Sequence, residues 1–287
     1  MAAPPPACHH PRVSGTLFLV GTPIGNLGDL SARARETLAL ADVVAAEDTR
    51  RTGRLLKSLD IRRPLVSFFD ANERTRAVEL LSRLREGQTV VVVSDGGMPT
   101  VSDPGYWLVR ACAREGIDVR VVPGPSAVLA ALVVSGLPTD RFTFEGFAPR
   151  KPGERMRRLD ALRADPRTIV FFESPLRVKS LLRDVMVAFG DRPVALCREL
   201  TKRHEEVLRG RASEVLASLG EDAPKGEVVL VVGGAEDVTV GDLPTAVAHA
   251  RELVTEGMRK RDAARASAER HGLAANDVYR QLVGPGT

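Results

Sequence analysis

The segment Ser94–Gly105, with the sequence SDGGMPTVSDPG, has the residue types most suited to binding a small molecule. It contains two aspartates, three glycines and two prolines within twelve residues. It follows the apolar run Thr89–Val93, and a simple connection between a strand and a helix needs only about two to six residues. The composition therefore predicts a rigid, sharply bent ligand-binding loop at the end of a strand.

A second glycine-rich loop, Gly21–Asp29, has glycines separated by four and then three positions. A dinucleotide-binding fingerprint needs separations of two and three, and a phosphate-binding loop needs a lysine after its last glycine. Both are excluded, which leaves either a turn that lets the backbone approach a ligand or a purely structural turn.

Pro123–Ser126 precedes a predicted helix, whose first amides suit a carboxylate or other anion. The alternative is an ordinary helix that starts with a proline and binds no ligand.

Two later segments concentrate polar and charged groups. Phe172–Arg177 places the carboxylate of Glu173 and a guanidinium around the start of a helix. Cys197–Glu206 holds many polar groups behind a strand, and a solvated loop is its simple alternative. His204, followed by two glutamates, lacks the spacing that helical zinc ligands need, and no Gly-x-Ser-x-Gly motif indicates a serine nucleophile. We therefore expect no metal site.

The unusual loops follow predicted strands. Between residues 16 and 135 a strand, a loop and a helix alternate about five times, which is typical of an open parallel sheet covered by helices. Ser31 and Asn72 are predicted to cap helices, and Pro125 to lie in the first turn of another. The predicted strands are 16–20, 42–46, 65–68, 89–93 and 118–122, and the predicted helices 31–41, 52–59, 72–86, 106–114 and 125–135. Ligand sites in such sheets lie at the carboxyl ends of the strands, where these loops occur.

The sequence divides into four predicted regions. These are a disordered leader at 1–14, a first α/β domain at 15–136, a second α/β domain at 137–235 and a small helical segment at 241–287. Gly136–Pro138 is the predicted hinge, and two domains that face each other leave a cleft suited to a small ligand. The later predicted strands are 142–147, 168–173, 194–200, 206–209 and 227–233, and the later predicted helices 153–164, 175–189, 212–219, 244–256, 260–271 and 274–283.

Composition and charge narrow the class of protein. Of the 287 residues, 44% are hydrophobic and 27% charged, which excludes a fibrous or wholly disordered chain. The longest apolar runs, such as Val90–Val93, are too short to cross a membrane. Cys8, Cys112 and Cys197 lie far apart, which argues against disulfides and for a reducing, cytoplasmic compartment. The formal net charge of +4 permits a nucleic-acid partner without requiring one.

Eight motifs, in order along residues 15–234, resemble the tetrapyrrole methylase superfamily, and within it the branch that methylates ribosomal RNA. The motifs are GTPIGNLGDL, ALADVVAAEDTR, SDGGMPTVSDPG, PGPSAVLAALVVSGL, FEGFAPR, FFESPLR, CRELTKRHEE and KGEVVLVV. The resemblance implies two α/β domains, S-adenosylmethionine bound in the cleft between them, and a homodimer. It also implies 2′-O-methylation of a cytidine ribose in the decoding region of 16S ribosomal RNA, within the small ribosomal subunit. Ala46–Arg50 and Glu173–Pro175 differ from the tetrapyrrole branch, which favours RNA as the substrate.

The resemblance also implies which residues bind the methyl donor. They are Pro23, Gly25, Gly96, Gly97, Met98, Pro99, Val101, Ser126, Ala127, Glu173, Leu200, Thr201 and Gly226. Two departures from the family pattern stand out. The family usually has alanine where Gly96 or Gly97 stands, and it often has histidine where Leu176 stands, so we assign Leu176 no role.

Methyl transfer needs little activation of the leaving group, because the sulfonium donor already carries a positive charge. The enzyme must align the methyl carbon with the attacking oxygen at about 3 Å. A ribose hydroxyl is a poor nucleophile while protonated, so a base or a polarising cation is expected nearby. Glu173 or Lys202 is the first expectation, and Asp48 and His204 are alternatives. Arg50, Arg177 and Arg203 are the predicted phosphate contacts.

Two other functions are compatible with the sequence. The first is a methyltransferase that acts on a tetrapyrrole precursor and shares the same cofactor cleft. The second is an RNA-binding module that uses the basic residues of the C-terminal helices, such as Arg261 and Arg265, and keeps an inactive pocket. Transfer of methyl to a porphyrinogen would distinguish the first, and RNA binding that ignores the methyl donor would distinguish the second.

Overall fold

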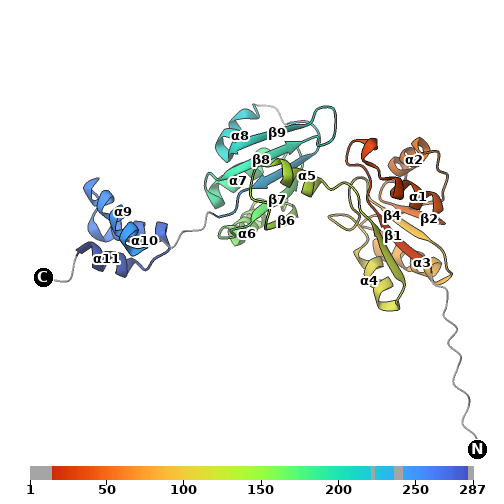
Figure 1. Cartoon of the computed structure of the whole chain (residues 1–287), viewed down its shortest axis with the longest axis horizontal. Coiled ribbons are helices and arrows are strands. Elements are labelled where there is room, and N and C mark those ends of the chain that lie inside the picture. Colours follow the sequence, from red (N-terminus) through yellow and green to blue (C-terminus); the bar gives the residue numbers. More distant parts are fainter. Residues whose placement is uncertain (1–14, 221–223, 236–241, 284–287) are drawn as a thin grey trace, which may run out of the picture.

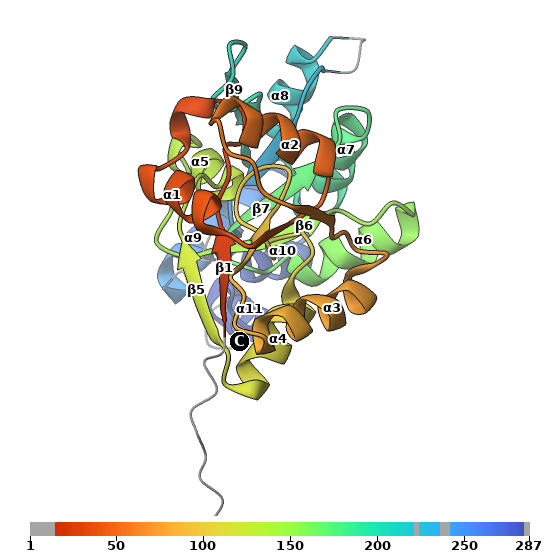
Figure 2. The ribbon, with the colours of Figure 1, turned by 90° about the vertical axis from the view of Figure 1, so that its right-hand side faces the viewer.

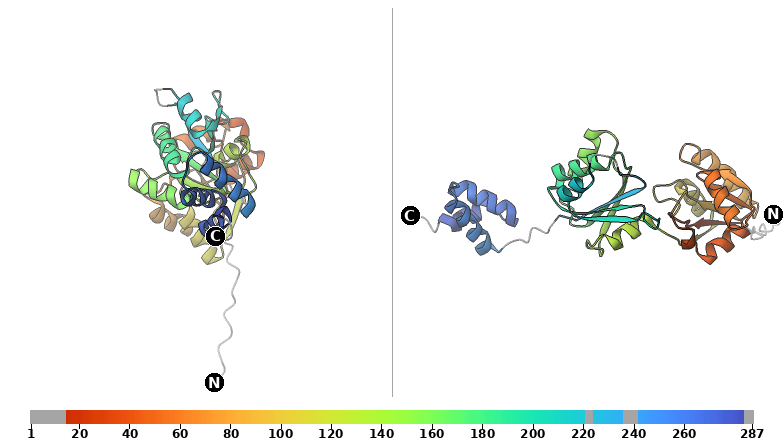
Figure 3. Two further views of the ribbon diagram at one scale, coloured as in Figure 1. Left: turned by 90° about the vertical axis from the view of Figure 1, so that its left-hand side faces the viewer. Right: turned by 90° about the horizontal axis from the view of Figure 1, so that it is seen from above.

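The computed structural model describes residues 15–220, 224–235 and 242–283. The predicted leader at 1–14, with Cys8, lies outside the described residues, as does the predicted start of the last segment at 241. The elements form two five-stranded sheets, each between layers of helices, followed by a group of three helices (Figures 1 and 3).

The first sheet is entirely parallel, as the sequence predicts. Its strand order is β3-β2-β4-β1-β5. The strands are β1 (Thr16–Val20), β2 (Val43–Ala46), β3 (Leu65–Ser67), β4 (Val90–Val93) and β5 (Asp118–Val122). Every residue of β2 and β4 is buried, because helices cover both faces of the sheet. Continuous apolar runs without alternation are the sequence signature of such strands.

Helices cover the two faces of this sheet in pairs (Figure 2). The helices are α1 (Ala32–Leu40), α2 (Thr49–Ser58), α3 (Glu73–Arg85) and α4 (Tyr106–Glu115), with a short 3-10 turn η1 at Leu27–Asp29. Leu80 of α3 and Leu108 of α4 pack on one face, and Leu38 of α1 and Leu56 of α2 on the other. Ser31 caps α1 as predicted, since its hydroxyl accepts a hydrogen bond from the Ala34 amide.

Two predicted helix starts and one predicted side-chain cap in this part of the chain are wrong, and each has a local cause. Helix α2 begins at Thr49 rather than 52, because the Asp48 carboxylate accepts the amides of Arg50 and Arg51 and fixes the first turn there. Helix α3 begins directly after Asn72, as predicted, but the Asn72 side chain does not cap it, because its oxygen accepts the Phe69 amide instead. Pro125 lies before helix α5 (Ala127–Val134), which Ser126 caps through the Leu129 amide.

The second sheet is mixed, with the order β6-β7-β10-β8-β9. Its strands are β6 (Phe142–Phe147), β7 (Thr168–Glu173), β8 (Pro193–Arg198), β9 (Glu206–Arg211) and β10 (Val228–Val232). Only β6 and β7 are parallel neighbours; β10 runs antiparallel to both β7 and β8. The ends of β7 and β8 and the start of β10 therefore lie at the same edge of the sheet.

Helix α5 packs on the second sheet, although it precedes the predicted hinge at Gly136–Pro138. Val128 and Leu132 of α5 share an apolar cluster with Ala195 of β8 and Val231 of β10. The opposite face of that sheet is covered by α6 (Pro152–Leu162), α7 (Val178–Phe189) and α8 (Ala212–Ser218). Helix α7 begins at Val178, three residues after the predicted start. The chain thus crosses from the first sheet to the second before α5, directly after Pro123–Ser126.

The C-terminal helices α9 (Leu243–Thr255), α10 (Lys260–His271) and α11 (Ala275–Val283) form an apolar cluster of their own residues. Ala246, Ala250 and Ala264 are at its centre, so small side chains allow the three helices to pack closely. Within the described ranges, no helix is long and apolar enough to cross a membrane. Cys112 and Cys197 are buried free thiols in different cores.

Candidate active site

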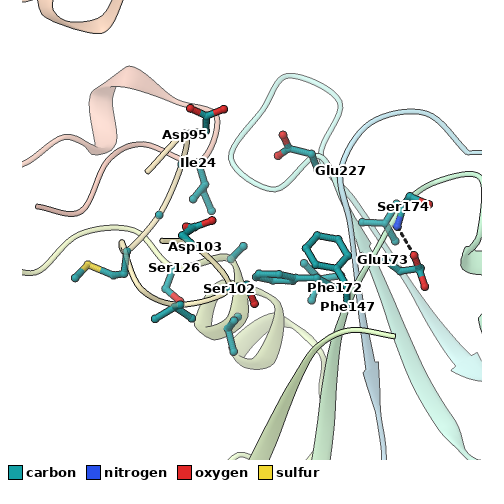
Figure 4. Close-up of a pocket in the computed structure, with 18 of the residues that line it drawn as sticks. Ile24, Asp95, Ser102, Asp103, Ser126, Phe147, Phe172, Glu173, Ser174 and Glu227 are labelled. Carbon is teal, nitrogen blue, oxygen red and sulfur yellow. Dashed lines mark hydrogen bonds between the residues drawn. The ribbon is translucent and has the colours of Figure 1, made fainter. Parts of the chain in front are cut away.

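A cleft of about 440 Å³ lies where the loops of the first sheet face the second sheet (Figure 4). The loops after β2, β4 and β5 line one side, and the ends of β6 and β7 with the start of β10 line the other. The predicted cleft between the two halves is therefore present. It lies at the carboxyl ends of the parallel strands, where ligand sites of such sheets occur.

The loops that line the first-sheet side of the cleft are joined to one another by close glycine contacts. Gly21 and Gly124 touch backbone to backbone, so that a methyl group added at either would lie 2.7–2.8 Å from the other. Thr22 and Gly97 exchange two backbone hydrogen bonds of 2.9 and 3.0 Å, which joins the loop after β1 to the loop after β4. The spacing of the glycines in these loops therefore serves loop packing as well as ligand approach.

The loop Ser94–Gly105 is sharply bent, as its composition predicts, and its backbone is also strained. Thr100 and Ser102 have positive φ angles of 75° and 62°, a conformation that costs a non-glycine residue about 1–3 kcal/mol. Gly97 and Gly105 also have positive φ angles, of 91° and 134°. The surrounding contacts hold this loop in a conformation that turns Val101, Ser102 and Asp103 into the lining of the cleft.

The geometry decides which glycine of this loop can be replaced by the alanine usual in the family. Gly96 has an ordinary φ, and its added methyl group would lie 3.3 Å from the Pro23 carbonyl oxygen. Gly97 has a φ of +91°, which L-residues rarely adopt. Alanine can therefore be accommodated at position 96, once the Pro23 carbonyl moves by a few tenths of an ångström, but is strained at position 97.

We expect Gly96→Ala to leave the free energy of unfolding within about 0.5 kcal/mol of the wild type. Gly97→Ala should lower it by about 1–2 kcal/mol, because alanine is strained at positive φ. Chemical denaturation of the two variants side by side measures both values. Equal stability of the two variants would contradict this assignment.

Three carboxylates, Glu47, Asp95 and Asp103, line the first-sheet side of the cleft. Burial, then the charges of Glu47, Asp95 and Asp70, raise the pKa of Asp103 to about 7, while a hydrogen bond from Ser94 opposes the shift. Burial and the charge of Asp95 also raise the pKa of Glu47. Arg51, 3.4 Å from Asp95, is the cation that partly balances the group. A carboxyl group with a pKa near 7 can accept a proton at neutral pH.

The second-sheet side is an aromatic wall above a buried ion pair. Phe172 lies edge-on to Phe147, with 5.7 Å between ring centroids. Behind them the carboxylate of Glu173 is fully buried, accepts the Ser174 amide at 2.7 Å and lies 3.1 Å from the Arg177 guanidinium. Figure 4 shows the Glu173 carboxylate turned away from the centre of the cleft. Arg177 also donates to the carbonyl oxygens of Ala148 and Pro149, so this pair fixes the wall in place.

Lys202 joins two loops at the edge of the second sheet. Its ammonium group lies 2.9 Å from the Glu199 carboxylate and 3.2 Å from that of Glu227, which lines the cleft. Burial alone would lower the pKa of Lys202, but the bonds to Glu199 and Glu227 raise it above its usual value. Gly226 allows this packing, since a side chain there would overlap Glu199.

Eight of the thirteen residues predicted to bind the methyl donor line the cleft: Gly96, Gly97, Met98, Val101, Ser126, Ala127, Glu173 and Gly226. Pro23 lines an adjoining cavity of about 370 Å³ that shares Arg51 and Asp95 with the cleft. Gly25 packs against Leu200–Lys202, and Leu200 is part of the apolar core. The hydroxyl of Thr201 is buried without a hydrogen-bond partner. Pro99 lines neither cavity.

The remaining predicted residues lie outside the cleft lining. Asp48 caps α2, and hydrogen bonds from the backbone and side chain of Arg50 lower its pKa. His204 is exposed and lines a different cavity, with Arg198 and Lys225. Arg50 and Arg203 are exposed on the surface, whereas Arg177 is part of the buried pair. Leu176, at the histidine position of relatives, is 83% exposed.

Sequence reasoning missed Asp103, Glu47 and the aromatic pair Phe147 and Phe172. Asp103 lay inside the loop already singled out, but its burial and acidic neighbours depend on three separate loops. Phe147 and Phe172 lie at or next to the ends of two predicted strands. Ligand sites occur at the carboxyl ends of strands, so this position could have identified both residues.

Comparison with known proteins agrees with this architecture. The family model for Tetrapyrrole (Corrin/Porphyrin) Methylases matches residues 16–216. Ribosomal RNA small subunit methyltransferase I of Thermotoga maritima is 50% identical over 222 residues, which cover 77% of this chain and 100% of the relative. The protein of the same name from Mycobacterium tuberculosis is 48% identical over 270 residues, covering 93% of this chain and 94% of the relative.

Among solved structures, uroporphyrin-III-C-methyltransferase from Thermus thermophilus matches with a TM-score of 0.56 and 27% identity, over 76% of this chain and 94% of that one. Residues 1–122, up to the end of β5, are less than half of the chain. A match over 76% of the chain therefore extends beyond the first sheet into the second. Sequence family, relatives and fold agree. This chain belongs to the tetrapyrrole (corrin/porphyrin) methylase family.

Proposed function

We propose that this protein transfers a methyl group from S-adenosylmethionine to 16S ribosomal RNA of the small subunit, at the 2′-hydroxyl of a cytidine in the decoding region. The supporting observation is the 48% identity, over nearly the whole of both chains, to a protein named for methylation of small-subunit ribosomal RNA. The cleft supports methyl transfer, because its glycine loops, aromatic wall and carboxylates suit a nucleoside with a cationic, amino-acid-like arm.

The residues of the cleft fit S-adenosylmethionine. Phe147 and Phe172 offer an aromatic surface for the adenine ring. The amides after Ser126, at the start of α5, suit the carboxylate of the methionine arm. The buried, unpartnered hydroxyl of Thr201 can pair with a polar group of a ligand that reaches the Gly25 turn. When bound, the donor supplies an electrophilic methyl group on sulfur.

We propose Asp103 as the group that accepts the proton of the ribose hydroxyl. The four candidates from the sequence are less suited: Glu173 and Lys202 are held in ion pairs, Asp48 caps a helix and His204 faces another cavity. Asp103 lines the cleft, and its carboxyl group has a pKa of about 7. Glu173 and Lys202 then act as positioning residues that hold the two walls of the cleft.

Arg50 and Arg203 stay proposed phosphate contacts because both are exposed. A homodimer and a cytoplasmic location are further parts of this proposal, by likeness to the family. Replacing a phosphate contact should reduce the slope of RNA affinity against salt concentration by about one unit.

The proposed function is tested by incubating the protein with tritiated S-adenosylmethionine and small ribosomal subunits from a strain that lacks this gene. Digestion of the RNA to nucleosides should place the label in 2′-O-methylcytidine from the decoding region. Uroporphyrinogen is the matched competitor substrate. Label in the porphyrinogen and none in the RNA would replace this proposal with tetrapyrrole methylation.

A further inference from the structure

Helix α4 begins with two aromatic side chains that face solvent. Tyr106 is 58% exposed and Trp107 is 37% exposed. The chain has only one tryptophan and two tyrosines, so its sole tryptophan and half of its tyrosines are adjacent at this one surface position. Large aromatic side chains are usually well buried, and an exposed group of them marks an interaction site more often than chance placement does.

Two arginines flank these rings. The guanidinium of Arg74, from α3, lies over the Trp107 ring at 4.7 Å from its centroid, and that of Arg110 lies at 5.5 Å. Neither arginine forms a salt bridge with any carboxylate of the described ranges, although most arginines near α3 do, such as Arg76 and Arg85. Their positive charges are therefore available to an anionic partner.

The patch of Arg74, Tyr106, Trp107 and Arg110 is rigid. The buried carboxylate of Glu73 accepts the amides of Gly105 and Trp107, at 2.8 and 3.1 Å, which fixes the first turn of α4. The two rings pack edge to face with 5.4 Å between centroids. Helices α3 and α4 also pack side by side (Figure 2). A rigid surface loses little conformational freedom on binding, which favours recognition.

The patch begins three residues after Asp103, the last residue of this loop that lines the cleft. Tyr106 follows Asp103 by three residues, so their Cα atoms are at most about 11 Å apart. A chain whose reacting sugar lies at Asp103 would therefore pass close to the two rings. Aromatic rings with arginines beside them are the groups that bind unpaired RNA bases, through stacking, and the adjacent phosphates, through charge.

We propose that this patch binds an unpaired base of the RNA substrate, next to the nucleotide that enters the cleft. The inference rests on the proposed function, and it adds where the RNA lies on the surface. RNA is favoured over a protein partner because the patch joins stacking surfaces to two arginines that form no salt bridge within the described ranges, and because it lies three residues along the chain from the cleft-lining Asp103.

The sole tryptophan makes the test direct. Titration of the protein with single-stranded oligocytidylate should change the Trp107 fluorescence in a saturable way. Tyr106→Ala and Arg74→Ala should each weaken binding, read from the same signal, by about 5-fold or more, since loss of one base-stacking contact changes affinity at least that much. Arg114→Ala is the matched control, because Arg114 is exposed and is the second-to-last residue of α4; this variant should bind as the wild type does.

Inorganic polyphosphate carries negative charge but no bases, so its binding, compared with that of oligocytidylate, separates the contribution of stacking from that of charge. Oligocytidylate should bind more tightly than polyphosphate of equal charge, and Tyr106→Ala should remove that difference. Equal binding of both polymers, or wild-type affinity in Tyr106→Ala, would overturn the inference. In the tritium assay, Tyr106→Ala should raise the KM for small subunits at least 5-fold while the KM for the methyl donor stays unchanged. If the wild type methylates small subunits and Tyr106→Ala has the same KM for them, this inference alone is overturned. If the wild type does not methylate RNA, the proposed function is overturned.

Discussion

Replacing Asp103 with asparagine is expected to lower the rate of methyl transfer to RNA by about 100-fold or more, the usual contribution of a positioned general base. Asparagine keeps the shape of the side chain but cannot accept the proton of the ribose hydroxyl. The affinity for S-adenosylmethionine, measured by calorimetry, should stay within a few fold of the wild type. Unchanged turnover in this variant would show that another group accepts the proton.

The pH dependence of the wild type should carry the signature of the same residue. Because burial and the nearby charges of Glu47, Asp95 and Asp70 raise the pKa of Asp103 to about 7, the rate should rise with pH up to about 7 and level above it. Arg51 forms an ion pair with Asp95, one of these charges, so Arg51→Ala should leave Asp95 unbalanced and move this midpoint to higher pH. The residual activity of Asp103→Asn should lack the rise, and Glu173→Gln, which alters a positioning residue, should keep it.

The raised pKa also makes a prediction for stability. Asp103 binds its proton more tightly in the folded protein than in the unfolded chain, where its pKa is near the ordinary aspartate value of 3.8. Its contribution to the free energy of unfolding is therefore fully present below about pH 4 and is lost as the pH rises to about 7. Asp103→Asn should show less loss of melting temperature between pH 4.5 and 8 than the wild type.

The second large effect is expected at Gly124, where alanine should destabilise the protein by about 3 kcal/mol. The added methyl group would lie 2.8–2.9 Å from three backbone atoms of Gly21, and backbone cannot move aside as a flexible side chain can. The displaced loops also carry Ile24 and Ser126 of the cleft lining, so donor affinity should fall at least tenfold. Denaturant unfolding and calorimetry measure the two effects.

Gly153→Ala is the matched control for Gly124→Ala. Gly153 lies in the first turn of α6, and an added methyl group there meets nothing within 4 Å. Alanine at this position should leave stability unchanged or raise it by up to about 1 kcal/mol, because it restricts the unfolded chain. Equal losses in both variants would show that the contact between Gly21 and Gly124 has no special importance.

Much of the fold was predictable from the sequence because local residue patterns determine the helices and strands. The apolar runs of β2 and β4 and the alternation of strands with helices predicted the parallel first sheet, and nearly all strand positions were correct. The start of α2 was missed because it depends on one hydrogen-bonding group, the Asp48 carboxylate, rather than on apolar periodicity. The position of α5 was missed for a different reason: its apolar residues show that it is buried, but not against which sheet.

The sequence by itself determined the elements, the family and the loops that gather around the cleft, because short-range composition and ordered motifs specify them. Only the tertiary structure decided which side chains of those loops can do chemistry. Glu173 and Lys202 have suitable types, yet the folded chain holds them in ion pairs. Asp103 gains its raised pKa from burial and from charges such as that of Glu47, and Trp107 gains the Arg74 guanidinium over its ring from α3, so both depend on residues distant in sequence. Burial and the field of neighbouring charges arise only when separate loops meet, so no reading of spacing along the chain could supply them.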